Sequence, residues 1–431
     1  MAMLEWVMAA MLLAAQGAAT PDSATPASAP APKAVDRAAA DAAIESVLPQ
    51  VSGIRGLEFK RKVPVEVIDV ARARKYARAR FEATTPATKI TADQKAFELL
   101  GLIPPGVDVL DTLLDVLEEQ AGGFYDPGAK RFYLLDTMPK EMAGAFAAHE
   151  MTHALEDQYY DIDGRLAKIV DDDDATFALS SVAEGSASLA MAIYIVHGIA
   201  AGKMQTSDLE ALRESDAGRA KRLDAMPGVL RKELLAPYVL GALFLQRGAP
   251  GAAPDAFPKS AVDAAWADPP RSSEQILHPA KYWDKEHRDL PKPVTLGGVS
   301  QVLGNGWIRA GSGILGEIAI GGLVGAPSPT SHDDAAMVSA SGWTNAAASG
   351  WGGDRWELWT HGGAAVVLLK TLWDSPQDAV EFEAALPTRP GLAFQREGST
   401  VAVVAGDPEG KMKPLLAVLA GVPIASSAGT H

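Results

Sequence analysis

The stretch Ala145–Asp161, AFAAHEMTHALEDQYYD, decides how the rest of the sequence is interpreted. At its centre stands His149-Glu150-Met151-Thr152-His153. Two histidines four residues apart lie about one turn apart on one face of a helix, so both imidazoles can reach one metal ion. H-E-x-x-H on a helix is the zinc-hydrolase signature, in which the intervening glutamate acts as general base on a metal-bound water. We therefore expect a helix over 141–160 that carries His149 and His153 as ligands and Glu150 as base.

A catalytic zinc site needs a third protein ligand, and Glu184 is the strongest candidate. It is the only charged residue in the apolar run 175–196, ATFALSSVAEGSASLAMAIYIV, which we expect to be a buried core helix rather than a membrane span. A buried carboxylate without a partner costs several kcal/mol, roughly 3 or more, and a metal ion removes that cost. The alternative is that Glu184 is protonated or pairs with a basic side chain.

Asp157 lies on the same helix face as the two histidines, but it lies too far along the helix to bind the same ion. From His149 to Asp157 the helix rises about 12 Å. Bonds to zinc are only about 2 Å long, so Asp157 is predicted to orient a ligand imidazole from outside the coordination sphere. Aspartates 161, 163 and 171–174 lie in predicted loops and remain possible ligands, although 171–174 is more typical of a solvated helix N-terminus.

Composition narrows the possible classes of protein. The chain has 431 residues with a net charge of −15, which argues against nucleic acid and anionic membranes as partners. It contains no cysteine, which excludes disulfides, thiolate metal sites and a cysteine nucleophile. A metal ion must then be held by carboxylates and by some of the 8 histidines.

The N-terminus predicts export to the periplasm or the medium. Residues 1–19 contain a short apolar run followed by small residues, as in a signal peptide, although Glu5 replaces the usual basic residues. Residues 20–37 are rich in proline, alanine and serine and predict a disordered linker. We expect no stable membrane anchor once the signal segment is cleaved.

The remaining pattern predicts an α+β fold that is mainly helical. We expect a metallohydrolase domain over 38–326 and an α+β C-terminal subdomain over 327–425. The predicted helices cover 38–48, 70–83, 92–100, 107–120, 141–160, 175–196, 207–224, 234–245, 260–266, a segment near Leu315, 376–386 and 410–420. The predicted strands are a strand at 62–69, a hairpin at 122–135, a hairpin formed by 350–359 and 364–373, and a strand at 400–405.

Peptide hydrolysis also needs a donor for the oxyanion, and the sequence offers several. Arg271 and His278 lie in the segment 268–279, DPPRSSEQILHP, which lacks core periodicity. Tyr125 lies in the predicted hairpin, whose strand edge could bind an extended peptide, and Arg355 lies in GWGGDRW at 350–356. Each of these residues could equally make a structural hydrogen bond or ion pair.

The motifs together resemble the gluzincin, or thermolysin-like, branch of zinc metallopeptidases, in which two helical histidines and a glutamate on the next helix bind zinc. The whole run is most similar to a family of poorly characterised bacterial exported proteins. The similarity covers about residues 45–410 and rests on GFYDP, HEMTHALEDQ, VAEGSA, DPPRSSEQILHP and GWGGDRW. It implies a zincin-like core with His149, His153 and Glu184 as zinc ligands and Glu150 as base. One departure from the thermolysin pattern is Ser188, where that group has an aspartate.

These observations predict a zinc-dependent metallopeptidase-like hydrolase that acts on a peptide or protein substrate. Two alternatives stay open. The first is a metal-binding scaffold without turnover, against which the intact Glu150 argues, since a structural site needs no base. The second is a zinc hydrolase of a non-peptide substrate or a cell-wall amide.

Overall fold

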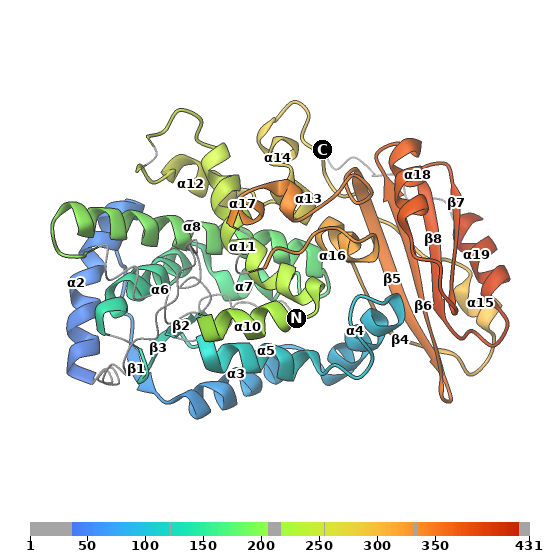
Figure 1. Ribbon diagram of the computed structural model, residues 1–431, viewed down its shortest axis with the longest axis horizontal. Coiled ribbons are helices and arrows are strands. Elements are labelled where there is room, and N and C mark those ends of the chain that lie inside the picture. Colours follow the sequence, from blue (N-terminus) through green and yellow to red (C-terminus); the bar gives the residue numbers. More distant parts are fainter. Residues whose placement is uncertain are drawn as a thin grey trace, which may run out of the picture.

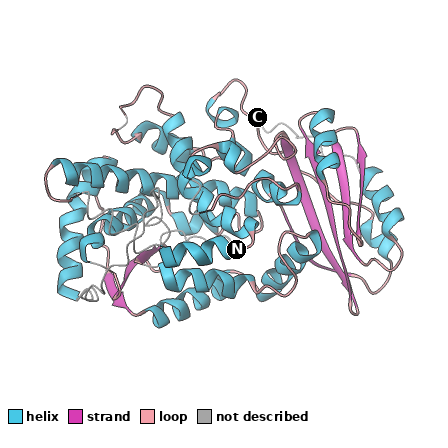
Figure 2. Cartoon of the chain, in the orientation of Figure 1, coloured by secondary structure: helices cyan, strands magenta, loops and turns pink. Residues whose placement is uncertain are grey.

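The computed structural model describes residues 37–421, apart from 121, 139, 206–216, 254 and 331–333. The fold is α+β, as predicted, with 52% of the chain in helices and two small sheets. Helices form most of the molecule, and a five-stranded sheet covers one end (Figures 1 and 2). The predicted signal segment, 1–19, and nearly all of the predicted linker, 20–37, lie outside the described residues.

The first half of the chain builds a helical layer around a small sheet. Gly101 ends one of its helices in the left-handed conformation that glycine adopts easily. The arginines of the basic helix at 70–84 pair with acidic side chains such as Asp111 and Asp163, as expected of a solvated surface helix. The elements are α2 (Arg37–Arg55), β1 (Val65–Ile68), α3 (Val70–Thr84), α4 (Ala87–Leu100), α5 (Val109–Gln120), β2 (Gly123–Asp126) and β3 (Arg131–Leu135).

The small sheet has the strand order β1-β3-β2 and is buried on both faces. β3 pairs in parallel with β1 and antiparallel with β2, which confirms the predicted hairpin. Side chains alternate along β3: Phe132 and Leu134 join a core cluster with Phe146 of the H-E-x-x-H helix, whereas Tyr133 faces the other core. The sheet therefore supports the helix that carries the motif.

Three long helices cross in the centre of the molecule. They are α6 (Lys140–Tyr160), α8 (Asp173–Ala200) and α11 (Gly228–Arg247). α8 is the one helix among the described residues that is long and apolar enough to cross a membrane, but 67% of its apolar window is buried inside the fold, as the core-helix prediction requires. Asp172 caps its N-terminus through the Ala175 N–H, yet Asp174 in its first turn is buried rather than solvated.

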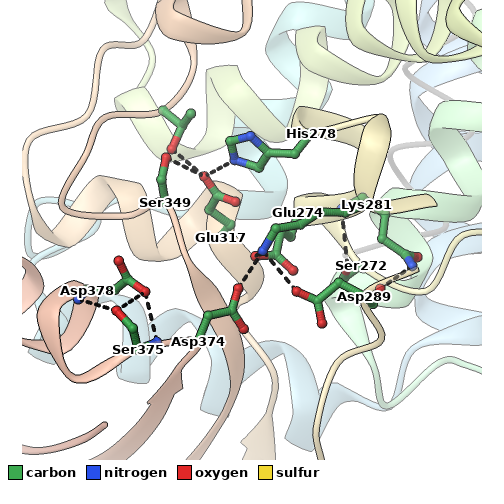
Figure 3. Close-up of polar contacts among 12 residues, drawn as sticks. Ser272, Glu274, His278, Lys281, Asp289, Glu317, Ser349, Asp374, Ser375 and Asp378 are labelled. Atoms are coloured by element: carbon green, nitrogen blue, oxygen red, sulfur yellow. Dashed lines mark hydrogen bonds and ion pairs between the residues drawn. The ribbon is translucent and has the colours of Figure 1, made fainter. Parts of the chain in front are cut away.

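Shorter elements connect the central helices to the C-terminal sheet. Ser375 and Asp378 begin one of these helices with a reciprocal capping box (Figure 3). The elements are α7 (Ile162–Leu166), α10 (Ala217–Ala225), α12 (Lys259–Ala267), α13 (Ser273–Leu277), α14 (Ala280–Trp283), α15 (Val299–Leu303), α16 (Gly316–Leu323), α17 (Asp334–Met337), η2 (Ala340–Gly342), α18 (Pro376–Ala385) and α19 (Met412–Gly421).

The C-terminal sheet is antiparallel throughout, with the order β4-β5-β6-β8-β7. On β6, Val367 and Leu369 face the main core with Trp356, while Val366 and Leu368 pack under α15 and α19. α4 from the first quarter of the chain lies against β4 and β5, so both ends of the sequence share one core (Figure 1). The strands are β4 (Ile308–Gly313), β5 (Trp351–His361), β6 (Ala364–Trp373), β7 (Leu392–Glu397) and β8 (Thr400–Gly406).

The predicted strands are all present, but the structure has two further strands, β4 and β7, that the sequence pattern did not reveal. Part of the helix predicted at 207–224 lies outside the described residues. Because β4 begins at Ile308, the C-terminal sheet starts earlier in the chain than the predicted boundary at residue 327.

Candidate metal centre

Close helix packing forms the candidate site. Gly185 of α8 faces Gly241 of α11, and a Cβ on Gly241 would lie 2.0 Å from the Ser181 carbonyl oxygen. Only glycine permits backbones to approach so closely. Glu184 directly precedes Gly185 in α8, so this contact places it between α11 and the motif helix α6.

His149, His153 and Glu184 converge on one point and are each at most 1% exposed. The His149 Nε2 lies 3.2 Å from the Glu184 Oε2 and 3.0 Å from the His153 Nε2, and the His153 Nε2 lies 3.4 Å from the same carboxylate oxygen. Ligands bound tetrahedrally at about 2.05 Å are separated by about 3.3 Å. The three atoms are therefore close enough to one another to bind a single metal ion.

The favoured protonation states also suit a cation. Burial lowers the pKa of His149 to about 4, so its imidazole is neutral at pH 7. Burial acts to raise the pKa of Glu184, but the neighbouring His153 and His149 outweigh it and lower the pKa to about 2. The neutral imidazole of His149 and the carboxylate of Glu184 are both suitable donors for a divalent metal ion.

Glu150 lies beside the cluster and is completely buried. Its Oε2 accepts a 2.6 Å hydrogen bond from the Tyr125 N–H on the edge strand β2, while its Oε1 has no partner among the described residues. Burial, together with the charge of Glu184, raises the pKa of Glu150 well above its usual value, which the Tyr125 N–H only partly opposes. The strand edge that we expected to bind a peptide is occupied at Tyr125 by the Glu150 carboxylate.

A buried ion pair holds the C-terminal end of the motif helix α6. Glu156 of α6 accepts hydrogen bonds from Arg55 of α2 at 2.6 Å and from Ser186 of α8 at 2.7 Å. Both charged side chains are fully buried, so each depends on the other. This network ties the helices that carry His149, His153 and Glu184 to one another.

The contacts of Asp157 differ from those of the predicted imidazole-orienting residue. It accepts hydrogen bonds from the Tyr125 hydroxyl at 2.8 Å and the Ile162 N–H at 3.0 Å, and it pairs with Lys130 at 2.9 Å. Asp157 thus acts through Tyr125, whose backbone N–H holds Glu150. At the position where thermolysin-like enzymes have an aspartate, the Ser188 hydroxyl donates to the Glu184 carbonyl at 2.6 Å.

The side chains of the predicted oxyanion donors are held elsewhere than beside His149, His153 and Glu184. The Tyr125 hydroxyl is bonded to Asp157, and only its N–H reaches Glu150. The His278 Nε2 lies 3.0 Å from Glu317, which also accepts from Thr344 at 2.6 Å (Figure 3). These contacts arise from long-range packing that local sequence does not encode.

Arg271 and Arg355 are also placed elsewhere. Both line a surface hollow beside Asp172, at the N-terminus of α8. Twelve residues separate Asp172 from Glu184 along the helix, a rise of about 18 Å. In this structure neither arginine side chain therefore lies beside His149, His153 and Glu184.

Tyr238 of α11 is a site residue that sequence reasoning missed. Its ring stacks on the His149 imidazole, with centroids 6.0 Å apart and planes at 22°. Burial and the charges of Glu184 and Glu150 raise the pKa of its hydroxyl well above the usual value, so the group remains a proton donor. The signal was present in the apolar run 234–245, LLAPYVLGALFL, in which Tyr238 carries the only polar side-chain group.

Comparison with known proteins adds one partial match. A family model described as a domain of unknown function, DUF8575, matches residues 307–414. That segment begins one residue before β4 and contains the whole five-stranded sheet, so the match covers the C-terminal end and not the metal cluster. No curated protein and no solved structure matches the chain.

Proposed function

We propose that the chain is a zinc-dependent metallopeptidase-like hydrolase with a zincin-like core. The observation that carries this proposal is the convergence of three buried donor atoms from His149, His153 and Glu184 at tetrahedral spacing, with a free Glu150 oxygen beside them. A zinc ion held there would supply Lewis-acid activation of water and of a scissile carbonyl group.

The residues of the chain have separable roles in this proposal. Glu150 Oε1 accepts a proton and later delivers it to the leaving amine, and burial gives this carboxylate a high proton affinity. The Tyr125 N–H fixes the other oxygen, so the carboxylate cannot rotate away. The Tyr238 hydroxyl, which interacts with Glu184, is the donor that we assign to the developing oxyanion, in place of Arg271 and His278.

A second candidate function is a metal-stabilised scaffold without turnover. The observation in its favour is burial: His149, Glu150, His153 and Glu184 are each at most 1% exposed, so a polymeric substrate has no open path in this conformation. Hydrolysis then requires the packing between β2 and the central helices to open. Export of the mature chain, with a peptide or protein substrate outside the cytoplasm, remains part of the first proposal.

The test compares wild type with Glu150→Gln for zinc content and for cleavage of a mixed fluorogenic peptide library. We expect one zinc ion per chain in both proteins and a loss of cleavage of about 1,000-fold or more in the variant, because the amide cannot accept a proton. Equal zinc content without cleavage by wild type would favour the scaffold. A wild-type protein that binds no zinc would contradict both candidates.

A further inference from the structure

Two adjoining surface hollows lie away from the metal cluster. They share Asp172, Arg271 and Pro291, and their volumes are about 800 Å³ and 250 Å³. We call them together the Arg271 groove. Its walls come from the end of α6, α7, the start of α8, the segment 268–271 and β5. Segments that the sequence places far apart, including DPPR and GGDR, therefore meet here.

Several cations line the groove. Lys292 pairs with Asp374 at 3.4 Å, and the charge of Arg355 acts on Asp172. Arg165, Lys168 and Arg271 have no carboxylate partner within the described part of the chain. The Arg271 side chain is exposed, and only its backbone N–H is held, by the Gln275 amide oxygen at 2.7 Å. Arg355 donates to the Ser312 hydroxyl at 2.8 Å, and Arg165 donates to the Tyr160 carbonyl at 2.6 Å. Lys168 is exposed at the wall of the larger hollow.

The aspartates of the groove are mostly neutralised or engaged. Asp268 pairs with Arg288, and Asp354 accepts hydrogen bonds from the Leu315 and Gly316 N–H groups. Burial raises the pKa of Asp354 to about 6 and that of Asp174 well above its usual value. Asp172 caps α8 and feels the charge of Arg355, and Asp161 is exposed at the larger hollow, 3.8 Å from Lys130. Asp354 is still mostly ionised at pH 7. The groove cations without a carboxylate partner among the described residues are therefore Arg165, Lys168 and Arg271, in a protein whose net charge is −15.

The volume and the apolar lining of the larger hollow indicate which kind of ligand fits it. A hollow of about 800 Å³ is far larger than a phosphate or acetate ion. Ile169, Leu179 and three prolines, 269, 270 and 291, add apolar lining to the larger hollow. A ligand that matches this lining carries carboxylates for the cations and apolar side chains for the prolines.

We propose that the Arg271 groove binds an acidic peptide segment, with carboxylates held by Arg271 and Arg355 and apolar side chains against the prolines. Guanidinium groups bind carboxylates through two parallel hydrogen bonds, and these two arginines have donors free for that geometry. The site lies about 18 Å along α8 from Glu184, so its binding does not depend on the proposed hydrolysis.

The test measures fluorescence anisotropy of a labelled hexapeptide that alternates glutamate and leucine. Its uncharged counterpart alternates glutamine and leucine. All proteins carry Glu150→Gln, so that any hydrolysis cannot consume the probe. The test variant adds Arg271→Gln and Arg355→Gln. The matched control adds Arg247→Gln, which removes an equally exposed guanidinium at the end of α11, outside the groove.

We expect the acidic peptide to bind about 10-fold or more tightly than its uncharged counterpart, and the double arginine variant to lose about 10-fold or more of that affinity. The Arg247→Gln control should stay within about 2-fold, and salt should weaken binding because the contacts lie near the surface. Equal affinity for both peptides, no binding, or an unchanged affinity in the double variant would overturn the proposal. Displacement of the peptide by inorganic phosphate at the concentration at which unlabelled peptide displaces it would also overturn it, in favour of a simple anion site.

Discussion

Among the described residues, two clusters each offer three ligand atoms that could hold a metal ion, and they differ in whether a side chain of the protein supplies the cation. In the first, His149, His153 and Glu184 converge with no basic side chain among them. In the second, Glu274, Asp289 and Asp374 surround the Lys281 ammonium at 2.5, 3.0 and 2.6 Å (Figure 3). The second cluster is thus neutralised by the chain itself.

The difference separates a structural cluster from a candidate metal centre. Lys281 links α14 to Glu274 of α13 and to Asp374, the residue before the Ser375 cap of α18, so it ties the helical part to the sheet. In the first cluster the Glu184 carboxylate lies beside two buried imidazoles instead of a lysine, and buried charge must be compensated. An external cation is therefore expected at His149, His153 and Glu184 and not at Lys281.

The largest expected effect follows from removing the carboxylate of the first cluster. Glu184→Gln keeps the side-chain shape but loses the only anionic ligand, so zinc affinity should fall by about 100-fold or more. Competition with a chromophoric chelator measures the change. The matched control is Glu274→Gln, another buried glutamate, which should leave zinc affinity within about 3-fold. Wild-type affinity in Glu184→Gln would remove Glu184 from the ligand set.

The second prediction concerns removal of the cation from the Lys281 cluster. Lys281→Met removes the ammonium that Glu274, Asp289 and Asp374 share and leaves only Asp374 with another cation, Lys292 at 3.4 Å. Because Glu274 is only 1% exposed, the free energy of unfolding should fall by about 3 kcal/mol. Millimolar calcium should restore part of that loss, because oxygen ligands then face an unoccupied centre. Urea unfolding with and without calcium measures both effects.

Two outcomes would contradict this view of the Lys281 cluster. One is an unchanged stability of Lys281→Met, and the other is an equal response of wild type and variant to calcium. Lys285→Met is the matched control, since Lys285 is an exposed lysine of the same segment.

Much of the candidate site was predictable because its signals are local. Spacing alone placed His149 and His153 on one helix face, and Glu184 stood out as a lone charge in an apolar helix. The same argument applied to Tyr238 would have identified it, but a hydroxyl group in an apolar helix costs less to bury than a charge and gives a weaker signal. The rise per residue also kept Asp157 out of the predicted ligand set.

The missed features depend on contacts between distant segments. β4 has the sequence IRAGSG, whose glycines hide the strand pattern, and its pairing with β5 includes a register shift between Arg309 and Gly311. Arg271 looked like a catalytic donor because its segment, 268–279, lacks core periodicity, and Arg355 was a further candidate. Only the packing of 268–271 and β5 around Asp172 shows that they share a different hollow.

Lys232 of α11 is a buried cation whose charge is only partly compensated, and its substitution should have the smallest effect on stability. It is 1% exposed, its ammonium has no hydrogen-bond partner among the described residues, and Glu317 is near enough to act on its charge. Burial lowers the pKa of Lys232 from 10.5 to about 8. Between these values the unfolded chain holds a proton that the folded chain has lost, so stability rises with pH from about 8 to 10.5. Below pH 8 the buried ammonium opposes folding.

Lys232→Met should therefore stabilise the protein at pH 7, by at most about 3 kcal/mol, since methionine preserves the packing of the aliphatic stem. The gain should shrink as pH rises and vanish above 10.5, where wild-type Lys232 becomes neutral in both states. Urea unfolding of both proteins at pH 7 and pH 10 measures the difference, with Lys285→Met as the control for loss of a surface charge. A variant less stable than wild type at pH 7 would show that the ammonium compensates Glu317, as Lys281 compensates its carboxylates.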